Sequence, residues 1–542
     1  MNKIKSTVFY SILVFLITCT NSWAATYFVD KSIGNDANSG TISKPWKTIK
    51  KANSTLKAGD TVYLRGGTYS GEQIAPANDG TASKKISYAI YHDEIVTIRD
   101  IGTGIDLNNR KHIRVTGSPT KKLFVTNCDH NFTMNNAHHN ELAYLDLGKM
   151  RNFKSFKGAW AGAGSTYNWI HHCNVYKFGY YSSSQDYGDM FYIGASPALG
   201  NSYNLIEENH IYHGGHIPLK VTGKWNVIRN NYLHNEEWYP YDRPKYGNRA
   251  AAIIDYHDDH INGWNLIEGN RFAFTGIPSD ANFSAGIQHT NHDSIIRKNM
   301  FYACKGPGLK IETIRTASNA DDNYIYNNVF FYNGIGGVAE KYQTAIWLRA
   351  NVSGNVSWNF DHTVIKNNIF YKNPKNIKTS GTVTNTIAEN NWLIGDPKFI
   401  DAVPSKTVDP FNSDYPNFKL QERRDGKEGS PCIDAGGFLT KTVSAGNGNK
   451  IKVEDAHYFM DGWGIIEGDV IQLKGQTQTA RIINVDYNSN TLTIDKALEW
   501  SANQGLSLSY SGKSPDIGAF ESGADNSISL SPIKHLRVTA TQ

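Results

Sequence analysis

The sequence predicts an all-β solenoid, in which short strands stack into successive coils. The first observation is a seven-residue unit that recurs along the chain, as IHHCNVY from Ile170, IEENHIY from Ile206, IRNNYLH from Ile228, IEGNRFA from Ile267, IRKNMFY from Ile296, IYNNVFF from Ile325, IKNNIFY from Ile365 and AENNWLI from Ala388. The second is its spacing of 22 to 40 residues, which fits one coil that either is bare or carries a loop. A single coil cannot bury its apolar side, so coils must stack.

The fourth position of the unit is an asparagine in every copy except the first, where Cys173 takes its place. Asparagine tolerates a left-handed turn, and its amide can pass hydrogen bonds from one coil to the next. We therefore expect a structural ladder at one corner of the solenoid, formed by Asn209, Asn231, Asn270, Asn299, Asn328, Asn368 and Asn391.

The start of the chain is typical of an exported protein. Lys3 and Lys5 precede the apolar run VFYSILVFLI, and Ser22-Trp23-Ala24 offers small residues for cleavage, so residues 1–24 are predicted to be a signal peptide. We expect a secreted or periplasmic protein without a membrane span; a lipoprotein signal at Cys19 is the alternative. The formal net charge of +5 does not indicate nucleic-acid binding, and the protein is expected to be a monomer.

The remaining cysteines, Cys128, Cys173, Cys304 and Cys432, are too far apart to suggest a zinc site or a disulfide framework. We expect Cys173 and Cys304 to lie in the core as small hydrophobic residues. The abundance of glycine (48 residues) and tyrosine (30 residues) fits a surface that carries many turns and contacts sugars through rings.

Both ends of the presumed solenoid carry recognisable motifs. The first part reads YFVDKSIGNDANSGTISKPWKTIKKA from Tyr27 and AGDTVYLRGGTYSG from Ala58, and the last part contains GDPKFID, NFKLQ, GSPCIDAG and PDIGAFE. These motifs resemble those of the secreted right-handed parallel β-helix proteins of the pectate-lyase-like superfamily, which includes polysaccharide lyases. The resemblance covers most of the chain. It implies a capping helix over residues 45–56 and a first coil over residues 60–69.

The resemblance also defines the domain organisation. A right-handed parallel β-helix is expected over residues 25–436, a return to its end over residues 515–525, and a tail over residues 526–542. Residues 437–514 separate two motifs that usually lie close together, and they alternate strongly in GDVIQLKGQ, TARIINVDY and NTLTIDKAL. This insert is predicted to be a small antiparallel β-barrel or sandwich with a structural or accessory role.

The strands that precede each repeat unit carry the candidate site. Aligned on their apolar residues, they place an outward column at Tyr192, Lys220, Asp255, Gln288, Lys310 and Trp347. Two residues further on, a second column contains Gly194, Thr222, His257, Thr290, Glu312 and Arg349. Cations, carboxylates and rings intermixed in this way favour a groove for an anionic sugar chain, with solvated strand residues as the alternative.

Further substrate-binding residues are expected beside this strip. His289 follows the outward Gln288, and the loop HNEEWYPYDRPKYGNR after Asn231 supplies Trp238, Tyr241, Arg243 and Lys245. Aromatic rings stack on sugar faces, and guanidinium groups grip carboxylates bidentately. The loop would then form the wall of a subsite.

The chemistry that suits such a groove is β-elimination from a uronic-acid polysaccharide, in which a base removes the proton next to the carboxylate. β-Helix lyases commonly use a lysine or arginine as base, so the resemblance implies Lys220, or else Lys310, in this role. His257 or Arg249 would be the acid or the carboxylate clamp. A calcium ion, if used, would draw on Asp255, Asp258, Asp259 or Glu312.

Three other functions are compatible with the same residues. A glycoside hydrolase needs two facing carboxylic acids, which Asp255 with Glu312 or Asp186 with Asp189 could supply. A uronate epimerase begins with the same proton abstraction. A non-catalytic polysaccharide-binding surface protein would need no clustered base, acid and clamp.

Overall fold

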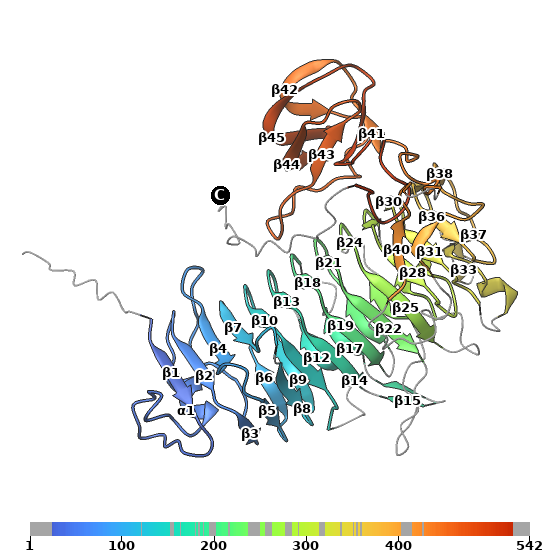
Figure 1. Cartoon of the computed structure of the whole chain (residues 1–542). Helices are drawn as coiled ribbons and strands as arrows, with labels where there is room; N and C mark the ends of the chain where they lie inside the picture. Colours follow the sequence, from blue (N-terminus) through green and yellow to red (C-terminus); the bar gives the residue numbers. More distant parts are fainter. Residues whose placement is uncertain are drawn as a thin grey trace, which may run out of the picture.

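The chain winds through three parallel sheets in a repeating order, so that each coil adds one strand to each sheet (Figure 1). The computed structural model describes residues 24–120, 122–151, 157–162, 164–178, 180–182, 185–187, 189–194, 202–214, 217–236, 250–254, 263–276, 284–290, 292–313, 320–335, 339–350, 352–353, 356–357, 360–402, 415–424 and 428–523. In these residues the predicted fold class, an all-β right-handed parallel β-helix with an antiparallel insert, is confirmed.

The three sheets are named here sheet 1, sheet 2 and sheet 3, in the order in which a coil passes through them. Sheet 1 contains β1 (Thr26–Val29), β2 (Thr61–Leu64), β4 (Ile86–Ile90), β7 (Ile113–Thr116), β10 (Glu141–Ala143), β13 (Trp169–His171), β18 (Leu205–Glu207), β21 (Val227–Arg229), β24 (Leu266–Glu268), β27 (Ile295–Arg297), β30 (Asn323–Tyr326), β35 (Thr363–Lys366) and β38 (Ile387–Glu389).

Sheet 2 contains β3 (Gly67–Ser70), β5 (Val96–Arg99), β8 (Leu123–Thr126), β11 (Leu145–Gly148), β14 (Asn174–Phe178), β19 (His210–Gly214), β22 (Tyr232–Glu236), β25 (Arg271–Gly276), β28 (Met300–Tyr302), β31 (Val329–Phe331) and β36 (Ile369–Tyr371). Sheet 3 contains β6 (Thr103–Asp106), β9 (His130–Met134), β12 (Lys157–Ala161), β17 (Asp189–Ile193), β20 (Ile217–Val221), β23 (Ala252–Ile254), β26 (Ile287–His289), β29 (Leu309–Glu312), β32 (Ile346–Arg349) and β37 (Ile377–Ser380).

The interior of the solenoid is a continuous apolar core, because residues at equivalent positions of successive coils stack on one another. Phe272, Phe301, Phe330 and Phe370 form such a column from sheet 2, with ring centroids 4.8 to 5.1 Å apart. This spacing is that of neighbouring strands, so each ring packs face to face on the next coil.

The predicted asparagine ladder is present at the corner between sheets 1 and 2. The side-chain amide of each asparagine donates to the side-chain oxygen of the next at 2.9 to 3.0 Å, from Asn209 to Asn391. The same amide nitrogen also donates backwards; that of Asn270, for example, bonds the carbonyl of Ile228 at 2.9 Å. One side chain therefore ties three coils together and satisfies buried backbone groups.

A second ladder, which the sequence analysis did not predict, lies at the corner where sheet 1 begins. It runs through Asn140, Asn168, Asn204, Asn226 and Asn265, with amide contacts of 3.2 Å. The residue before each of these asparagines is left-handed and aromatic: His139, Tyr167, Tyr203, Trp225 and Trp264. Their rings form a stacked column along the solenoid surface, with interplanar angles of 6 to 18°.

The N-terminal end differs from the sequence prediction in where its helix starts. Helix α1 spans Ile49–Thr55, because Thr48 caps it by accepting a hydrogen bond from the Lys51 backbone at 3.1 Å. Trp46, which was expected inside the helix, instead pairs with Val29 as an isolated bridge. Ile49 and Ala52 of the helix are buried against the first coil, so α1 does cap the solenoid core (Figure 1).

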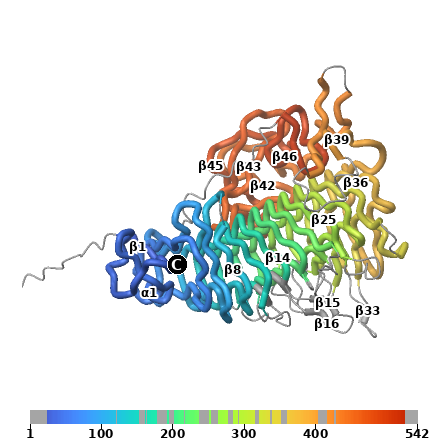
Figure 2. The backbone as a smooth tube through the Cα atoms, turned by 60° about the horizontal axis from the view of Figure 1, so that its bottom comes forward, coloured from blue at the N-terminus to red at the C-terminus, as the bar shows by residue number. Residues whose placement is uncertain are grey.

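The insert is an antiparallel sheet with the strand order β41-β46-β43-β44-β45-β42. Its strands are β41 (Thr440–Lys441), β42 (Gly446–Lys452), β43 (Val470–Leu473), β44 (Thr479–Asp486), β45 (Thr491–Trp500) and β46 (Gly505–Leu508). Figure 2 shows it lying along one side of the solenoid, opposite the hairpin of β15 (Tyr180–Ser182) and β16 (Gln185–Tyr187). The other short elements are β33 (Val352–Ser353), β34 (Val356–Ser357), β39 (Phe399–Asp401), β40 (Asn417–Leu420) and the 3₁₀ helix η3 (Glu340–Tyr342).

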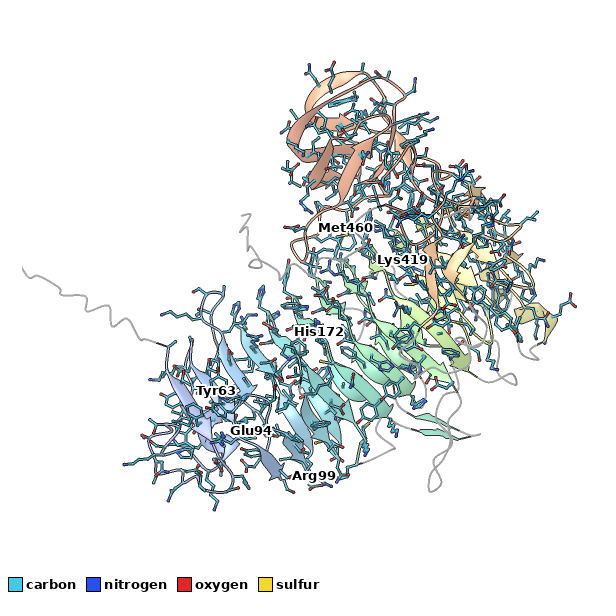
Figure 3. The ribbon with its side chains drawn as sticks, viewed as in Figure 1. Tyr63, Glu94, Arg99, His172, Lys419 and Met460 are labelled. Atoms are coloured by element: carbon cyan, nitrogen blue, oxygen red, sulfur yellow. The ribbon has the colours of Figure 1, made fainter. Side chains whose placement is uncertain are left out.

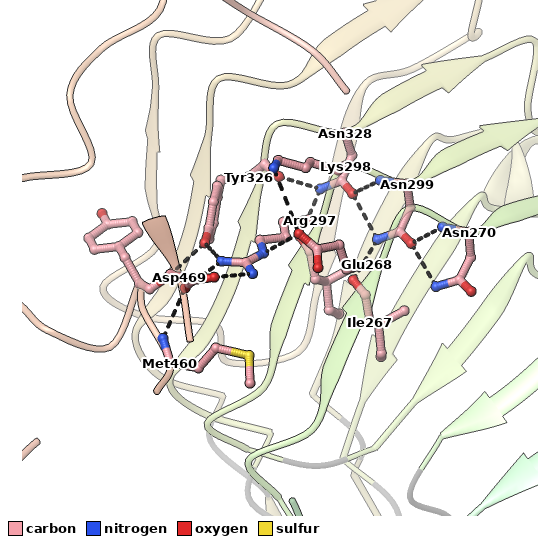
Figure 4. A network of polar contacts seen from close by, with 12 residues as sticks. Ile267, Glu268, Asn270, Arg297, Lys298, Asn299, Tyr326, Asn328, Met460 and Asp469 are labelled. Atoms are coloured by element: carbon pink, nitrogen blue, oxygen red, sulfur yellow. Dashed lines mark hydrogen bonds and ion pairs between the residues drawn. The ribbon is translucent and has the colours of Figure 1, made fainter. Parts of the chain in front are cut away.

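The insert packs on the outer face of sheet 1 through both apolar and charged contacts. Leu266 and Ile295 belong to the same buried cluster as Met460, which lies on the side of the insert that faces the solenoid (Figure 3). Arg297 of β27 forms a bidentate pair with Asp469, at 2.6 and 2.8 Å (Figure 4). This pair is buried and fully hydrogen-bonded, so it fixes the position of the insert on the solenoid.

Cys128, Cys173, Cys304 and Cys432 are buried and unpaired, as their spacing predicts. Burial raises the pKa of the Cys173 thiol to about 12, so it behaves as a small apolar group. No helix in the part of the chain that the structure describes is long and apolar enough to span a bilayer.

The ladder makes a sharp prediction about stability. Asn270→Ala should lower the free energy of unfolding by about 2 kcal/mol, because it removes the acceptor of the buried Asn231 backbone N–H and the amide that donates to the Ile228 carbonyl. Denaturant unfolding followed by circular dichroism would measure this. Asn484→Ala, at an exposed position on β44, is the control and should be neutral. Equal stability of the two variants would contradict the role given to the ladder.

Candidate functional site

Two of the three outer faces of the solenoid are covered by later parts of the chain. The insert covers sheet 1 from β18 to β35, where Leu205 and Val364 join its core. The segment containing β40 and the return segment cover sheet 2 beyond β22, where Phe418 and Ile517 pack against Tyr302. A substrate that has to reach the strands is therefore expected on sheet 3.

The lengths of the connections also single out sheet 3. Two residues join sheet 1 to sheet 2 at each corner of the ladder, as at 208–209, 230–231, 269–270 and 298–299. Several connections that enter or leave sheet 3 are much longer, and these include residues 237–251, 255–265, 277–286 and 313–322. Long loops held on a rigid scaffold are where binding and catalytic residues concentrate.

The strand register of sheet 3 confirms most of the predicted outer column and corrects one position. Tyr192 pairs with Lys220, Gln288 with Lys310, and Lys310 with Trp347. Lys220, however, pairs with Ile253 and not with Asp255. A shift of two residues preserves the alternation of faces, so the alternating pattern could not reveal it. The column continues to Lys378 of β37.

Lys310, Glu312, Arg349 and Gln288 form a buried polar cluster on this face. Glu312 accepts from Lys310 Nζ at 2.9 Å, from Arg349 NH1 at 3.1 Å, and from the Gln288 amide. Lys310 is 0 % exposed and Glu312 is 3 % exposed. The cluster combines two cations with one carboxylate, so it presents a fixed positive charge.

Trp347 lies at the centre of this positive region. Lys310 Nζ is 5.3 Å, Arg349 Cζ 5.2 Å and Lys378 Nζ 5.1 Å from the centroid of its ring. Its indole N–H donates to Ser380 Oγ at 2.8 Å, which holds the ring in place. Each cation is attracted to the electron-rich face of the ring, and this attraction offsets part of the repulsion between the cations.

Lys220 occupies a different environment at the other end of the column. Its ammonium lies 5.1 Å from the Tyr192 ring, and the side chain is half-buried, whereas Lys310 is enclosed. Three rungs separate the two lysines, roughly 14 Å at the strand spacing, so they cannot serve the same bond. Lys310 is enclosed and bound by Glu312, whereas Lys220 is partly accessible, which makes Lys220 the better candidate for a base.

His289 is not part of the outer strip, contrary to the prediction. It pairs with Ile311, whose side chain lies in the core, so its own side chain points into the solenoid. There its ring lies 3.1 Å from the Asn323 side chain. Gln288 and His289 are neighbours in the strand and therefore face opposite sides.

Several predicted residues lie outside the described part of the chain: Arg249, His257, Trp238, Tyr241, Arg243, Lys245, Asp255, Asp258 and Asp259. Of the alternative acids, Asp186 lies in β16 and Asp189 begins β17. Glu312 does not suit a calcium site, because its oxygens already accept from Lys310, Arg349 and Gln288. The described residues contain no group of three or more potential ligands placed to hold a metal ion.

The structure also shows a histidine cluster on sheet 2 that the sequence analysis missed. The Nε2 atoms of His210 and His234 lie 2.8 Å apart, and His234 Nδ1 lies 2.6 Å from Glu236. Since Nδ1 of His234 donates to the carboxylate, its Nε2 must accept, and His210 is the donor. His213 contacts the other oxygen of Glu236. These histidines belong to or follow the repeat units, which were interpreted as purely structural.

Similarities to known proteins are limited in extent or in identity. The family described as "Protein of unknown function (DUF1565)" matches residues 32–74, around α1 and the first coil. The uncharacterized protein YwoF of Bacillus subtilis (strain 168) is 40% identical over 65 residues, which are 12% of this chain and 14% of that protein. The matched region is thus about one seventh of the relative's length.

Solved structures with a similar fold include enzymes of different activities. Pectate lyase Pel9A is 16% identical (TM-score 0.47), covering 92% of this chain and 97% of that one. A rhamnogalacturonan lyase is 17% identical (TM-score 0.47), covering 74% and 96%. GH136 lacto-N-biosidase from Eubacterium ramulus is 12% identical (TM-score 0.35), covering 67% and 68%. These are likenesses of fold, so the activity has to be inferred from this chain's own residues.

The buried cluster predicts a strong coupling between Glu312 and Lys310. Glu312→Gln should lower the free energy of unfolding by about 3 kcal/mol, because it leaves two close cations without their carboxylate. Adding Lys310→Met should restore much of the loss, since the enclosed charge is then removed. Denaturant unfolding of the two single variants and the double variant measures the coupling; additive effects would contradict it.

The histidine cluster predicts sensitivity to acid. Burial, followed by the neighbouring His234, lowers the pKa of His210 to about 3. Burial alone would raise the pKa of Glu236, but hydrogen bonds from His213 and His234 lower it to about 2. The unfolded chain therefore binds more protons than the folded one below about pH 6.5, where an unperturbed histidine titrates, and stability falls with acidification.

Thermal melting at about pH 7.5 and about pH 5 tests this sensitivity. The melting temperature should drop more in the wild type than in His210→Gln, which keeps a hydrogen-bond donor but cannot titrate. An identical drop in both proteins would show that His210 does not contribute.

Proposed function

We propose that the protein is a polysaccharide lyase that cleaves a uronic-acid polysaccharide by β-elimination along the outer face of sheet 3, with Lys220 as the base. The observation that carries the proposal is the partly accessible Lys220 on the face from which the long loops emerge. From Tyr192 to Lys378, the described columns of this face hold four cations, Lys220, Lys310, Arg349 and Lys378, and the carboxylate of Glu312. Asp106 lies in the same column further toward the N-terminus.

The excess of positive charge suits an anionic polymer. It raises the local concentration of the substrate along the strip. Trp347 lies four rungs from Lys220, roughly 19 Å at the strand spacing. The strip is therefore long enough for several sugar units, with Lys220 at the bond that breaks and the Trp347 region holding the chain further along.

In the proposed reaction, Lys220 takes the proton from the carbon next to the carboxylate. The bond from the neighbouring carbon to the glycosidic oxygen then breaks, and a double bond forms in the sugar. An acid must protonate the departing oxygen, and His257 or Arg249 stays the prediction for this role. Tyr192 positions the Lys220 amino group, whose neutral form takes the proton, and offers its ring to a sugar face.

The export of the protein and a calcium requirement are parts of the proposal that rest on the sequence. A calcium ion would neutralise the substrate carboxylate, with ligands from Asp255, Asp258 and Asp259. The engagement of Glu312 with Lys310 and Arg349 argues against Glu312 as a ligand. No step assigned to Lys220 depends on the metal.

An absorbance assay with a panel of uronic-acid polysaccharides tests the proposal. Wild-type protein should release unsaturated products that absorb in the ultraviolet. Lys220→Ala should lower the rate by about 100-fold or more, because the base is lost. Lys224→Ala, an exposed lysine three residues after β20, is the matched control and should keep full activity. Loss of activity with a chelator would add the calcium requirement.

Other outcomes point to the other functions. Reducing ends without absorbance would indicate a glycoside hydrolase and direct attention to Asp255, Asp186 and Asp189. Exchange of the acidic proton with solvent, without chain cleavage, would indicate an epimerase. Binding of a polymer with none of these signals would indicate a polysaccharide-binding protein.

A further inference from the structure

A cavity of about 450 Å³ lies at the junction of the solenoid, the insert and the return segment. Its floor is formed by the corner between sheets 1 and 2, and its opposite wall by residues 507–509 at the end of β46 and by residues 515 and 518–521. The volume lies within the roughly 300–1,000 Å³ of typical ligand pockets. Sheet 3 is a different face of the coils, so this cavity is separate from the proposed catalytic strip.

Gly269 lies in the floor of the cavity. The corner residue is left-handed on every rung here, and the neighbouring rungs carry Asn230, Lys298 and Asn327 at this position. A Cβ atom at Gly269 would lie 2.4 Å from the side-chain oxygen of Asn230. The absence of a side chain on this rung therefore lets the Asn230 side chain lie directly over the backbone of Gly269 in the floor of the cavity.

Cations dominate the lining. Lys298 is 44% exposed and 3.8 Å from Glu268, whose carboxylate is already bound by Arg297 at 2.9 Å. Arg229 is paired with Glu207 at 2.6 Å. Arg271 lines the cavity and lies against the Tyr415 ring, with its Cζ 4.6 Å from the ring centroid.

The second acid of the lining, Glu521, adds little negative charge at neutral pH. Burial and the nearby Asp516 raise its pKa to about 8, although its oxygens accept from the backbone N–H groups of Ser511 and Asp516 at 2.9 and 3.0 Å. Lys298 is the cation whose charge lowers the pKa of Glu521. The cavity is thus positive at neutral pH.

The rest of the lining suits a sugar better than a simple inorganic anion. Asn230, Asn327 and Ser507 supply groups that can bond hydroxyls, while Leu508 and Phe520 supply an apolar surface. A pyranose ring has both hydroxyls and an apolar face, whereas phosphate has neither an apolar face nor its size.

We propose that this cavity binds a uronic-acid residue, at a chain end or as a free monosaccharide, with its carboxylate between Arg271 and Lys298. It is a second saccharide site, built by the insert together with the solenoid corner, and it does not require the lyase activity. Such a site would hold a polymer end or a released acidic product away from the catalytic strip. It gives the insert a binding role in addition to its contact with sheet 1.

Binding is tested with the full chain carrying Lys220→Ala, so that no polymer is cleaved. Galacturonate, glucuronate and mannuronate are titrated by calorimetry and by saturation-transfer NMR, with galactose and inorganic phosphate as the uncharged and non-sugar probes. At least one uronate should bind. Galactose and phosphate should bind at least about tenfold more weakly, because galactose lacks the carboxylate and phosphate lacks the sugar ring.

Two variants locate the site. Arg271→Gln removes a cation, and Gly269→Asn adds a side chain that must displace the Asn230 side chain in the floor, with a residue that tolerates the left-handed turn and occurs on neighbouring rungs. Each should weaken uronate binding by about tenfold or more, while Lys224→Ala should not. Unchanged binding in Arg271→Gln, equal binding of galactose or of phosphate, or no binding of any uronate would overturn the proposal; if Gly269→Asn does not fold, Arg271→Gln decides.

The outcomes are separable from those of the lyase assay. Uronate binding that persists in Lys220→Ala and is lost in Arg271→Gln supports the second site even if no polysaccharide is cleaved. Elimination by a wild-type protein whose Lys220→Ala form binds no uronate would leave the lyase proposal intact and remove the second site.

Discussion

The in-register stacking of coils is the constraint on which the rest of the structure depends. Backbone hydrogen bonds run from coil to coil in all three sheets, and the asparagine at the sheet 1–sheet 2 corner links each coil to the one before and the one after. This corner allows two residues and no more, because a longer turn would break the amide chain. In the coils from β18 to β36, the long connections therefore occur elsewhere, at the ends of the sheet 3 strands.

This constraint separates the structural parts of the molecule from the variable ones. The C-terminal third of the chain folds back over sheets 1 and 2, where Arg297 and Tyr302 anchor its contacts. Sheet 3 keeps the loops and a strip of buried charges in which Glu312 balances only part of the positive charge around Trp347. The proposed catalytic strip and the proposed uronate cavity thus use different faces of one scaffold.

The repeat in the sequence predicted the architecture well, because one residue type at one position, the corner asparagine, has a single physical role in each coil. The second ladder was missed because the repeat unit was taken to begin at its isoleucine, and Asn168, Asn204 and Asn226 each lie two residues before that isoleucine. The helix start was misplaced because the pairing of Trp46 with Val29 joins residues far apart in the sequence.

The sequence predicted which residues of the candidate site share a column on sheet 3, but it did not predict which side chains they contact. Lys220, Lys310 and Trp347 fell in one column because side chains alternate along a strand. Asp255 was assigned to the column because a two-residue slip leaves the alternation unchanged. The pairing of Glu312 with Lys310 and Arg349 could not be predicted from the sequence, because its three donors, Gln288, Lys310 and Arg349, come from three successive coils. The cavity at Gly269 could not be predicted from the sequence, because the insert forms one of its walls and the position of the insert was not known.

The docking of the insert has a consequence for the order of folding. A chain that emerges with its N-terminus first can stack the coils from β18 to β35 before residues 440–508 exist. During that interval Val227, Leu266 and Ile295 face solvent as an apolar stripe, because their cover is the last part to be made. The insert is therefore the cover of this apolar stripe, and a chain cut short before it would expose the stripe to other molecules.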